Sequence, residues 1–194
     1  MVLTQSTMMP LGSPAPDFNL KDARSQQQIS LNSIGSSQAL LVMFICCHCP
    51  FVKHIETQLA QIGIDYQNAD LKIVAISSND IEHYPADSPE KMAEMAERLD
   101  FTFPFCFDES QSIAKAYTAA CTPDFFLFNR DRYLIYRGQL DDSRPSNGKP
   151  VTGVDLRMAI DAVLSDRPIT TVQHPSIGCN IKWKPNQEPA YFSS

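Results

Sequence analysis

The 194-residue chain has no apolar run long enough to cross a membrane, because its longest, Ala39–Cys47, is well short of the ~18 residues required. It also has no run of Lys and Arg, and its net charge is −6 with a pI near 5.1. Both absences argue against nucleic acid and against a membrane as partners. The first residues, MVLTQSTMMPLG, show no basic segment followed by an apolar one. We therefore expect no secretory signal and a cytoplasmic protein.

Internal repeats and low-complexity tracts are absent too, and the apolar fraction of 43% is enough for a folded core. We expect one domain over 1–194, with residues 1–16 as an extended lead-in and residues 167–194 as an irregular, wrapping tail. Six cysteines would suit a disulfide-stapled secreted domain only in a much shorter chain. Here they indicate redox or metal chemistry.

The hydrophobic pattern predicts an α/β domain with a mixed sheet flanked by helices. Apolar runs at 39–45 and 71–77 are typical of strands buried on both faces. A period of 3.6 after Pro50 predicts an amphipathic helix with that proline in its first turn. A last helix is expected from 152 to about 165, because its start, Thr152–Asp155, has the form of a capping box. The other expected elements are strands at 29–31 and 103–107, helices at 88–99 and 110–117, and a hairpin of 125–128 and 133–137.

The motif FICCHCP at 44–50 joins the first buried strand to the amphipathic helix. We expect Cys46 at or near the helix N-terminus, where the helix dipole stabilises a thiolate. On a helix, Cys46 and Cys49 would be ~4.5 Å apart in rise, which suits a disulfide, whereas Cys47 would point elsewhere. His48, if protonated, would favour the Cys46 thiolate; the alternative is an exposed residue in the first turn.

Downstream, Thr122-Pro123 precedes the apolar strand 124–128, and this arrangement resembles the thioredoxin fold. In that fold a cis-proline precedes a strand that faces the active site, and the neighbouring backbone pairs with a substrate peptide. The resemblance assigns Pro123 to the cis-proline position beside the dithiol and Thr122 to substrate binding. An X–Pro bond is the linkage in which a cis peptide is cheap, although the sequence leaves the isomer open.

Four segments resemble, more closely, a branch of the redoxin group, the alkyl hydroperoxide reductase/thiol-specific antioxidant superfamily. The resemblance extends over nearly the whole chain and implies a thioredoxin fold, thiol–disulfide or thiol-peroxidase chemistry, an antioxidant role and no organic cofactor. The segments are FICCHCPFVKHIE at 44–56, ACTPDFFLF at 120–128, YRGQLDDSRP at 136–145 and PSIGCNIKWK at 175–184.

Two departures from the family pattern bear on the expected activity. Peroxiredoxins carry Pro-x-x-x-Thr/Ser-x-x-Cys, but Met43 stands three residues before Cys46, and Cys46 itself stands three residues before Cys49. The hydroxyl that positions a peroxide is therefore missing, which weakens a peroxidase interpretation. The second departure is Cys47, where the branch usually has Asn.

Three further residues are candidates for supporting roles. Cys121, two residues before Pro123, is either a resolving cysteine or metal ligand, or a small buried residue. Cys179, next to Gly178 in the tail, could reach an active-site disulfide. Arg144 either pairs with a carboxylate of its own loop, Asp141 or Asp142, which we favour, or receives an anionic group of the substrate.

We expect a thiol–disulfide oxidoreductase in which the Cys46 thiolate attacks a disulfide and Cys49 displaces the product. Its partners would be protein or small-molecule thiols and disulfides and a thioredoxin-type electron donor. One alternative is a module in which residues 46–49, with Cys121 or Cys179, hold Cu(I), Zn²⁺ or an iron–sulfur cluster. Another is a non-catalytic scaffold that uses the segment 80–100, with seven acidic and two basic residues, to dock a basic partner.

Overall fold

A seven-stranded mixed sheet forms the centre of the computed structural model, which describes residues 3–192. Its strand order is β3-β2-β6-β5-β4-β8-β9; β4 pairs in parallel with β5 and antiparallel with β8. The predicted α/β thioredoxin fold with a mixed sheet is therefore confirmed. The strands are β2 (Asn19–Asp22), β3 (Gln28–Ser30), β4 (Ala39–Phe44), β5 (Leu71–Ser77), β6 (Phe105–Phe107), β8 (Asp124–Asn129) and β9 (Leu134–Gly138).

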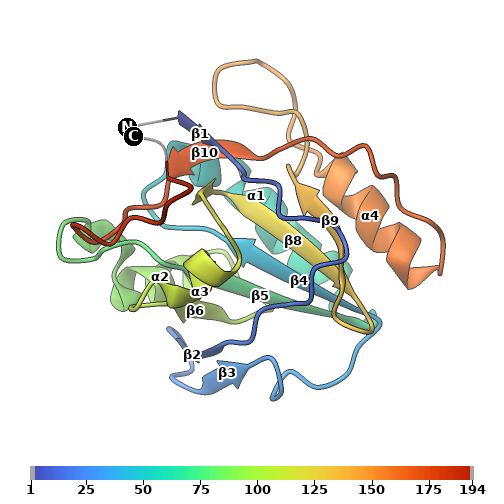
Figure 1. The fold of residues 1–194 in the computed structure, drawn as a ribbon, viewed down its shortest axis with the longest axis horizontal. Helices are drawn as coiled ribbons and strands as arrows, with labels where there is room; N and C mark the ends of the chain where they lie inside the picture. Colours follow the sequence, from blue (N-terminus) through green and yellow to red (C-terminus); the bar gives the residue numbers. More distant parts are fainter. Residues whose placement is uncertain (1–2, 193–194) are drawn as a thin grey trace.

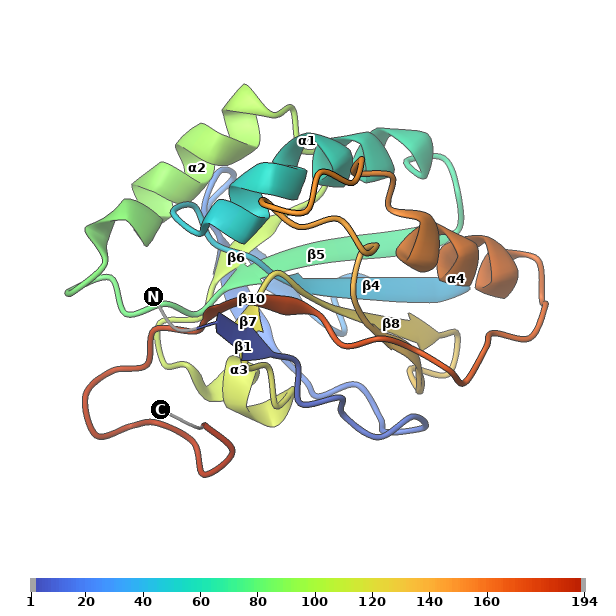
Figure 2. The same cartoon turned by 90° about the horizontal axis from the view of Figure 1, so that it is seen from above.

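Helices cover both faces of this sheet, as Figure 2 shows. On one face lie α1 (Pro50–Asp65), α2 (Pro89–Arg98) and α4 (Val154–Leu164), and on the other lies the short α3 (Ser112–Ala116). All six residues of β4 are buried, Leu41 and Met43 in the core under α1 and Val42 and Phe44 in the opposite core. A continuous apolar strand suits this position because it has no solvent-facing side.

A second, three-stranded sheet lies beside the first and joins the two ends of the chain (Figure 1). It consists of β1 (Leu3–Gln5), β10 (Ile177–Asn180) and β7 (Cys121–Thr122), all antiparallel. The expectation of an irregular tail is wrong over these residues of β10. Strands this short show no hydrophobic periodicity in the sequence. Their backbone groups form hydrogen bonds only with strands far away in the chain.

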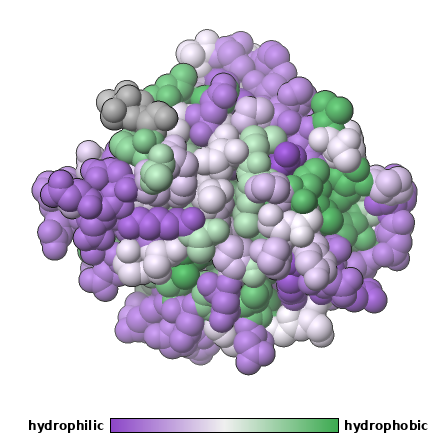
Figure 3. Space-filling view, in the orientation of Figure 1, coloured by the Kyte–Doolittle hydropathy of each residue, from purple (hydrophilic) through white to green (hydrophobic). Residues whose placement is uncertain are grey.

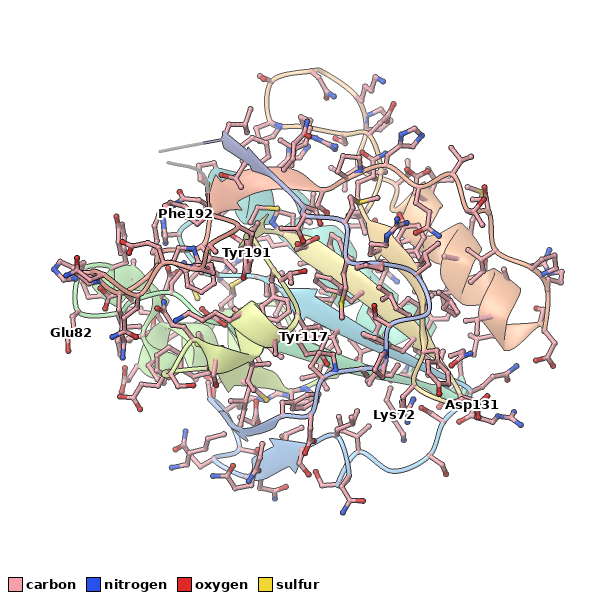
Figure 4. The ribbon with its side chains drawn as sticks, viewed as in Figure 1. Lys72, Glu82, Tyr117, Asp131, Tyr191 and Phe192 are labelled. Atoms are coloured by element: carbon pink, nitrogen blue, oxygen red, sulfur yellow. The ribbon has the colours of Figure 1, made fainter. Side chains whose placement is uncertain are left out.

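The tail is held on both sides of β10. Ahead of it, Ser176 Oγ donates to the carbonyl oxygen of Gly138 at 2.6 Å. Behind it, Ile181 and Trp183 are buried in the core on the α3 side. Figure 4 shows Tyr191 lying over this side of the molecule, where its hydroxyl donates to the carbonyl oxygen of Ala119 at 3.1 Å. The predicted wrapping is thus built from specific anchors.

The face shown in Figure 3 is largely polar, with apolar groups gathered on the α4 side. Met158 and Val172, with 58% and 73% of their surface exposed, are among the exposed large apolar residues of the protein. Within residues 3–192, no helix combines the length and the apolar character needed to cross a bilayer.

Candidate active site

The chemistry-bearing residues meet at the carboxyl edge of the two parallel strands. Residues 46–49 follow β4, and the segment that contains the 3-10 helix η1 (Pro85–Asp87) follows β5. Parallel pairing of β4 and β5 places the two segments side by side. Thr122-Pro123, at the start of β8, and β10 complete the site, because β8 pairs with β4 and β10 pairs with β7. Such edges are where ligands bind in open α/β sheets.

Helix α1 begins at Pro50, with Cys49 as its N-cap in an extended conformation (φ −65°, ψ 125°). The expectation that Cys46 lies at the helix N-terminus is therefore wrong, since it precedes the N-cap by three residues. The physical reason is Pro50 itself, because a residue before proline is excluded from the helical region. Cys46 and Cys49 are consequently not one helical turn apart.

Cys49 lies at the N-cap of α1, in contact with a second thiol. Its Sγ lies 2.8 Å from Cys179 Sγ and 3.2 Å from the carbonyl oxygen of Thr122. Hydrogen bonds from the Cys179 thiol, then from the Cys46 thiol and the Val52 amide, outweigh burial and hold the pKa of Cys49 far below its usual range. A cysteine at a helix N-terminus gains further from the helix dipole.

Cys46 is buried in this conformation, although the expected nucleophile must be reachable by a substrate. Its Sγ is buried, with 1% of the residue exposed, and lies 3.3 Å from Thr122 Oγ1. The hydrogen bond to Cys49, burial and the negative charge of Asp87 all raise the pKa of Cys46. The structure brings the two thiols together, as the motif predicted.

Asp87 organises the loop between β4 and α1. Its fully buried carboxylate accepts hydrogen bonds from the amides of Cys47 (2.8 Å) and His48 (3.0 Å) and from Asn79 Nδ2 (2.7 Å). Burial alone would raise the pKa of Asp87, but hydrogen bonds from His48, Asn79 and the Cys47 amide outweigh it and lower that pKa. Sequence analysis missed this residue because it lies in a segment interpreted as a solvated acidic surface. Its position after β5 was the available signal.

His48 takes part in the same arrangement. Its Nδ1 lies 2.5 Å from Asp87 Oδ2, its ring stacks on Tyr84 at 5.7 Å, and its side chain is 23% exposed. It therefore lies in the loop before α1, and not in the first helical turn. The contact with Asp87 fixes the orientation of the ring and leaves Nε2 as the nitrogen free for proton transfer.

The other thiols near the motif have different surroundings. Cys47 is half-buried, and burial together with the charge of Asp87 raises its pKa to about 12. The Cys121 thiol is fully buried and donates to the carbonyl oxygen of Pro123 at 3.6 Å. Burial raises the pKa of Cys121 well above its usual value, which fits a small buried residue.

Thr122 and Pro123 lie where the resemblance places them. The peptide bond between them is cis. Thr122 contacts Cys46 through its hydroxyl and Cys49 through its carbonyl oxygen. Its backbone also pairs with β10, with Cys179 as the directly opposite residue.

Arg144 has a structural role, but not the one expected. Its guanidinium donates to the carbonyl oxygens of Asp141 and Ser143, both at 2.7 Å, and to Gln139 Oε1 at 2.6 Å. The favoured ion pair with Asp141 or Asp142 is thus wrong, because Arg144 meets no carboxylate there. A pocket of about 20 Å³ between Arg144, Pro123 and Ile177 has room for about one water.

One group of side chains has the composition of a metal site. The Cys46 Sγ, a His48 ring nitrogen and an Asp87 oxygen all lie within 4.8 Å of one another. Sulfur, imidazole and carboxylate together suit Zn²⁺. Both Asp87 oxygens, however, already accept hydrogen bonds from this loop and from Asn79.

Comparison with known proteins places the chain in a family. The AhpC/TSA family model matches residues 11–137. An uncharacterized conserved protein from Geobacillus kaustophilus is 52% identical, with 96% of this chain and 98% of that one covered and a TM-score of 0.94. A hypothetical protein from Sinorhizobium meliloti 1021 is 50% identical over 94% of this chain and 100% of that one, with a TM-score of 0.92. No curated protein sequence matches.

More distant structures share the fold alone. The thioredoxin domain of a thiol-disulfide oxidoreductase from Bacteroides vulgatus is 16% identical, with 68% of this chain and 89% of that one covered and a TM-score of 0.57. At such identity the likeness describes the backbone, and function must be argued from the site.

Proposed function

The chain belongs to the AhpC/TSA family, and from this premise we propose that it is a thiol–disulfide oxidoreductase whose reactive thiolate is Cys49. The observation that carries the proposal is the Cys49 sulfur at the N-cap of α1, 2.8 Å from a second sulfur, that of Cys179. Thiolates are the nucleophiles of disulfide exchange. A thiolate can open a substrate disulfide, and a second thiol in contact with it can then resolve the mixed disulfide that results.

The reaction balances within the Cys46/Cys49 pair. The Cys49 thiolate attacks one sulfur of a substrate disulfide, forms a mixed disulfide and releases the other sulfur as a thiolate. The Cys46 thiol then gives up its proton and attacks Cys49, which releases the second substrate thiol and closes a Cys46–Cys49 disulfide. One disulfide is reduced and one is formed. The reverse sequence oxidises a substrate dithiol.

Substrate access requires a movement of the loop at residues 45–48. Cys46 and Cys49 are 1% and 0% exposed, so a substrate sulfur reaches neither of them in this conformation. The loop is tied to Asp87 through the amides of Cys47 and His48, and these are the contacts that opening must break. We propose that His48, whose side chain is partly exposed, carries a proton between this site and solvent.

Disulfides fit the site better than peroxides do. Cys46 occupies the position, three residues before Cys49, at which the peroxidase pattern requires a hydroxyl. We accordingly expect protein or small-molecule disulfides as substrates, with a thioredoxin-type electron donor, in the cytoplasm. An antioxidant role would follow from repair of disulfides.

The test is turnover of glutathione disulfide and of insulin by the reduced protein. We expect Cys49→Ser to abolish exchange, and the double variant Cys46→Ser/Cys179→Ser to accumulate a mixed disulfide at Cys49, because neither neighbouring thiol is left to resolve it. Cys106→Ser is the matched control, since Cys106 lies buried in β6, in the core on the other face of the sheet. Full activity of Cys49→Ser, or no trapped species in Cys46→Ser/Cys179→Ser, would refute the proposal.

A metal site is the second candidate, favoured by the proximity of Cys46, His48 and Asp87. Metal analysis of the purified protein and titration with Zn²⁺ distinguish the two functions. Stoichiometric, tightly held metal without disulfide exchange would replace the redox proposal. A protein that exchanges disulfides and releases Zn²⁺ to a weak chelator supports the redox proposal.

A further inference from the structure

We propose that Cys179 is a third redox thiol of this site, which takes the disulfide over from Cys46 by bonding to Cys49. The inference rests on the proposed function and extends it to a residue of the tail. Its first support is contact, because the Cys179 and Cys49 sulfurs lie 2.8 Å apart and both residues are buried. Two sulfurs held this close need only a small movement to form a bond.

The second support is the position of β10. This strand pairs antiparallel with β7, and Cys179 lies opposite Thr122, the residue before Pro123. The pairing of β10 with β7 therefore fixes Cys179 beside the cis peptide bond of Thr122-Pro123 and against the Cys49 sulfur.

The third support is the close fit of β10 to this edge. A Cβ atom on Gly178 would lie 2.0 Å from the carbonyl oxygen of Thr122, so only glycine allows this approach. The amide of Ile181 donates to the carbonyl oxygen of Ala120 at 3.0 Å, and the amide of Lys182 donates to Asn79 Oδ1 at 2.8 Å. Cys179 is thus held at Cys49 in this conformation by the fold itself.

The exchange step needs no outside oxidant. Starting from the Cys46–Cys49 disulfide, the Cys179 thiol loses its proton and attacks the Cys49 sulfur. The Cys49–Cys179 bond forms as the Cys46–Cys49 bond breaks, and Cys46 leaves as a thiolate that takes up a proton. The number of disulfides is unchanged. The disulfide no longer joins Cys49 to the loop before α1 but joins it to Cys179 in the tail. Cys46 returns to the reduced state.

The experiment is oxidation of the full chain by glutathione disulfide, followed by peptide mapping of the disulfides. We expect Cys46→Ser to form a Cys49–Cys179 disulfide, Cys179→Ser to form only Cys46–Cys49, and the wild type to contain both. Cys121→Ala is the matched control, because Cys121 lies in β7 beside the site and its thiol points to Pro123. It should give the wild-type pattern.

Two results have distinct meanings. If Cys46→Ser forms no Cys49–Cys179 disulfide while the wild type still forms Cys46–Cys49, the role of Cys179 is refuted and the proposed function stands. If the wild type forms no disulfide at Cys49 and exchanges none, both fail.

A second variant tests the placement of β10 without touching a thiol. Gly178→Ala drives a Cβ into Thr122 and pushes the strand away, so we expect Cys49–Cys179 formation to slow by roughly tenfold or more while Cys46–Cys49 formation persists. Gly148→Ala, where a Cβ meets no atom within 4 Å, is the control. Unchanged Cys49–Cys179 formation in a folded Gly178→Ala protein would overturn the proposal.

Discussion

Among single residues, Asp87 and Cys49 carry the two negative charges that shape this site. Asp87 lies under the loop and raises the pKa of Cys46 and Cys47, whereas Cys49, at the N-cap of α1, receives hydrogen bonds from its neighbours. The charge of Asp87 therefore disfavours a thiolate at Cys46 and at Cys47, because like charges repel.

Asp87→Asn should make Cys47 more reactive. The substitution keeps an oxygen that can accept the loop amides but removes the charge, which is the second cause, after burial, of the raised Cys47 pKa of about 12. We expect alkylation of Cys47 by iodoacetamide at about pH 8 to accelerate roughly tenfold, read by peptide mass spectrometry. Asp80→Asn is the control, because Asp80 is also buried in this segment but bonds His83. Equal Cys47 reactivity in both variants would show that Asp87 does not act through its charge.

The sequence located the members of the site better than their roles. Cys46, Cys49, His48 and Thr122 are brought together, as the motif and the thioredoxin resemblance predicted. The sequence did not show that the helix starts only at Pro50, so that Cys49 and not Cys46 is its N-cap. Asp87 is missed by a local pattern, which does not distinguish a buried carboxylate from its exposed neighbours; only its position after β5 indicates it.

Among the elements, the start of α4 shows how a loop far along the chain can cap a helix. Sequence predicted a capping box at Thr152–Asp155, but the helix begins at Val154 after Gly153, whose φ is 71°. The acceptor comes from Asp141, whose carboxylate binds the amides of Thr152 (2.7 Å) and Gly153 (2.6 Å). A residue more than ten positions away is invisible to a local pattern.

Asp141→Ala should lower the free energy of unfolding by about 1–3 kcal/mol, because it leaves three amides, those of Ser143, Thr152 and Gly153, without their acceptor. Urea denaturation followed by circular dichroism measures the change. Asp142→Ala is the neighbouring control, since Asp142 is exposed and pairs only with Lys149 on the surface. If the two variants lost the same stability, Asp141 would have no capping role.

The long apolar elements were predictable, and the short ones were not. β4, β5 and α1 follow from continuous burial and from a clear period. β7 and β10, of two and four residues, exist only because they pair with each other across the fold. The second sheet, which brings Cys179 to the site, therefore required the three-dimensional structure.

For the molecule as a whole, Asp124 makes stability depend on pH. Its side chain is completely buried next to Pro123, where Ser6 Oγ donates to it at 3.2 Å. Burial raises its pKa from 3.8 to about 8. Between these two values the folded protein holds a proton that the unfolded chain has released, so stability falls as pH rises through this window.

Asp124→Asn should remove this dependence. The amide oxygen can still accept the Phe125 amide, and its nitrogen can donate to Ser6, so the neutral contacts persist. We expect the variant to gain stability relative to the wild type as pH rises from about 4 to about 8, by several kcal/mol at the upper end. Urea midpoints across this range measure it. If the difference in unfolding free energy between the variant and the wild type stayed constant across this pH range, Asp124 would not titrate in it.

The thiolate of Cys49 is the feature on which the proposed chemistry most depends, and its ultraviolet absorbance measures it directly. In the reduced protein we predict one thiolate that persists as pH falls from about 9 to about 5, because hydrogen bonds from Cys179 and Cys46 hold the pKa of Cys49 down. Cys49→Ser should abolish this signal and Cys47→Ser should leave it. A signal that disappears near the ordinary cysteine pKa of about 8.5, or one that survives in Cys49→Ser, would show that Cys49 is not the reactive sulfur.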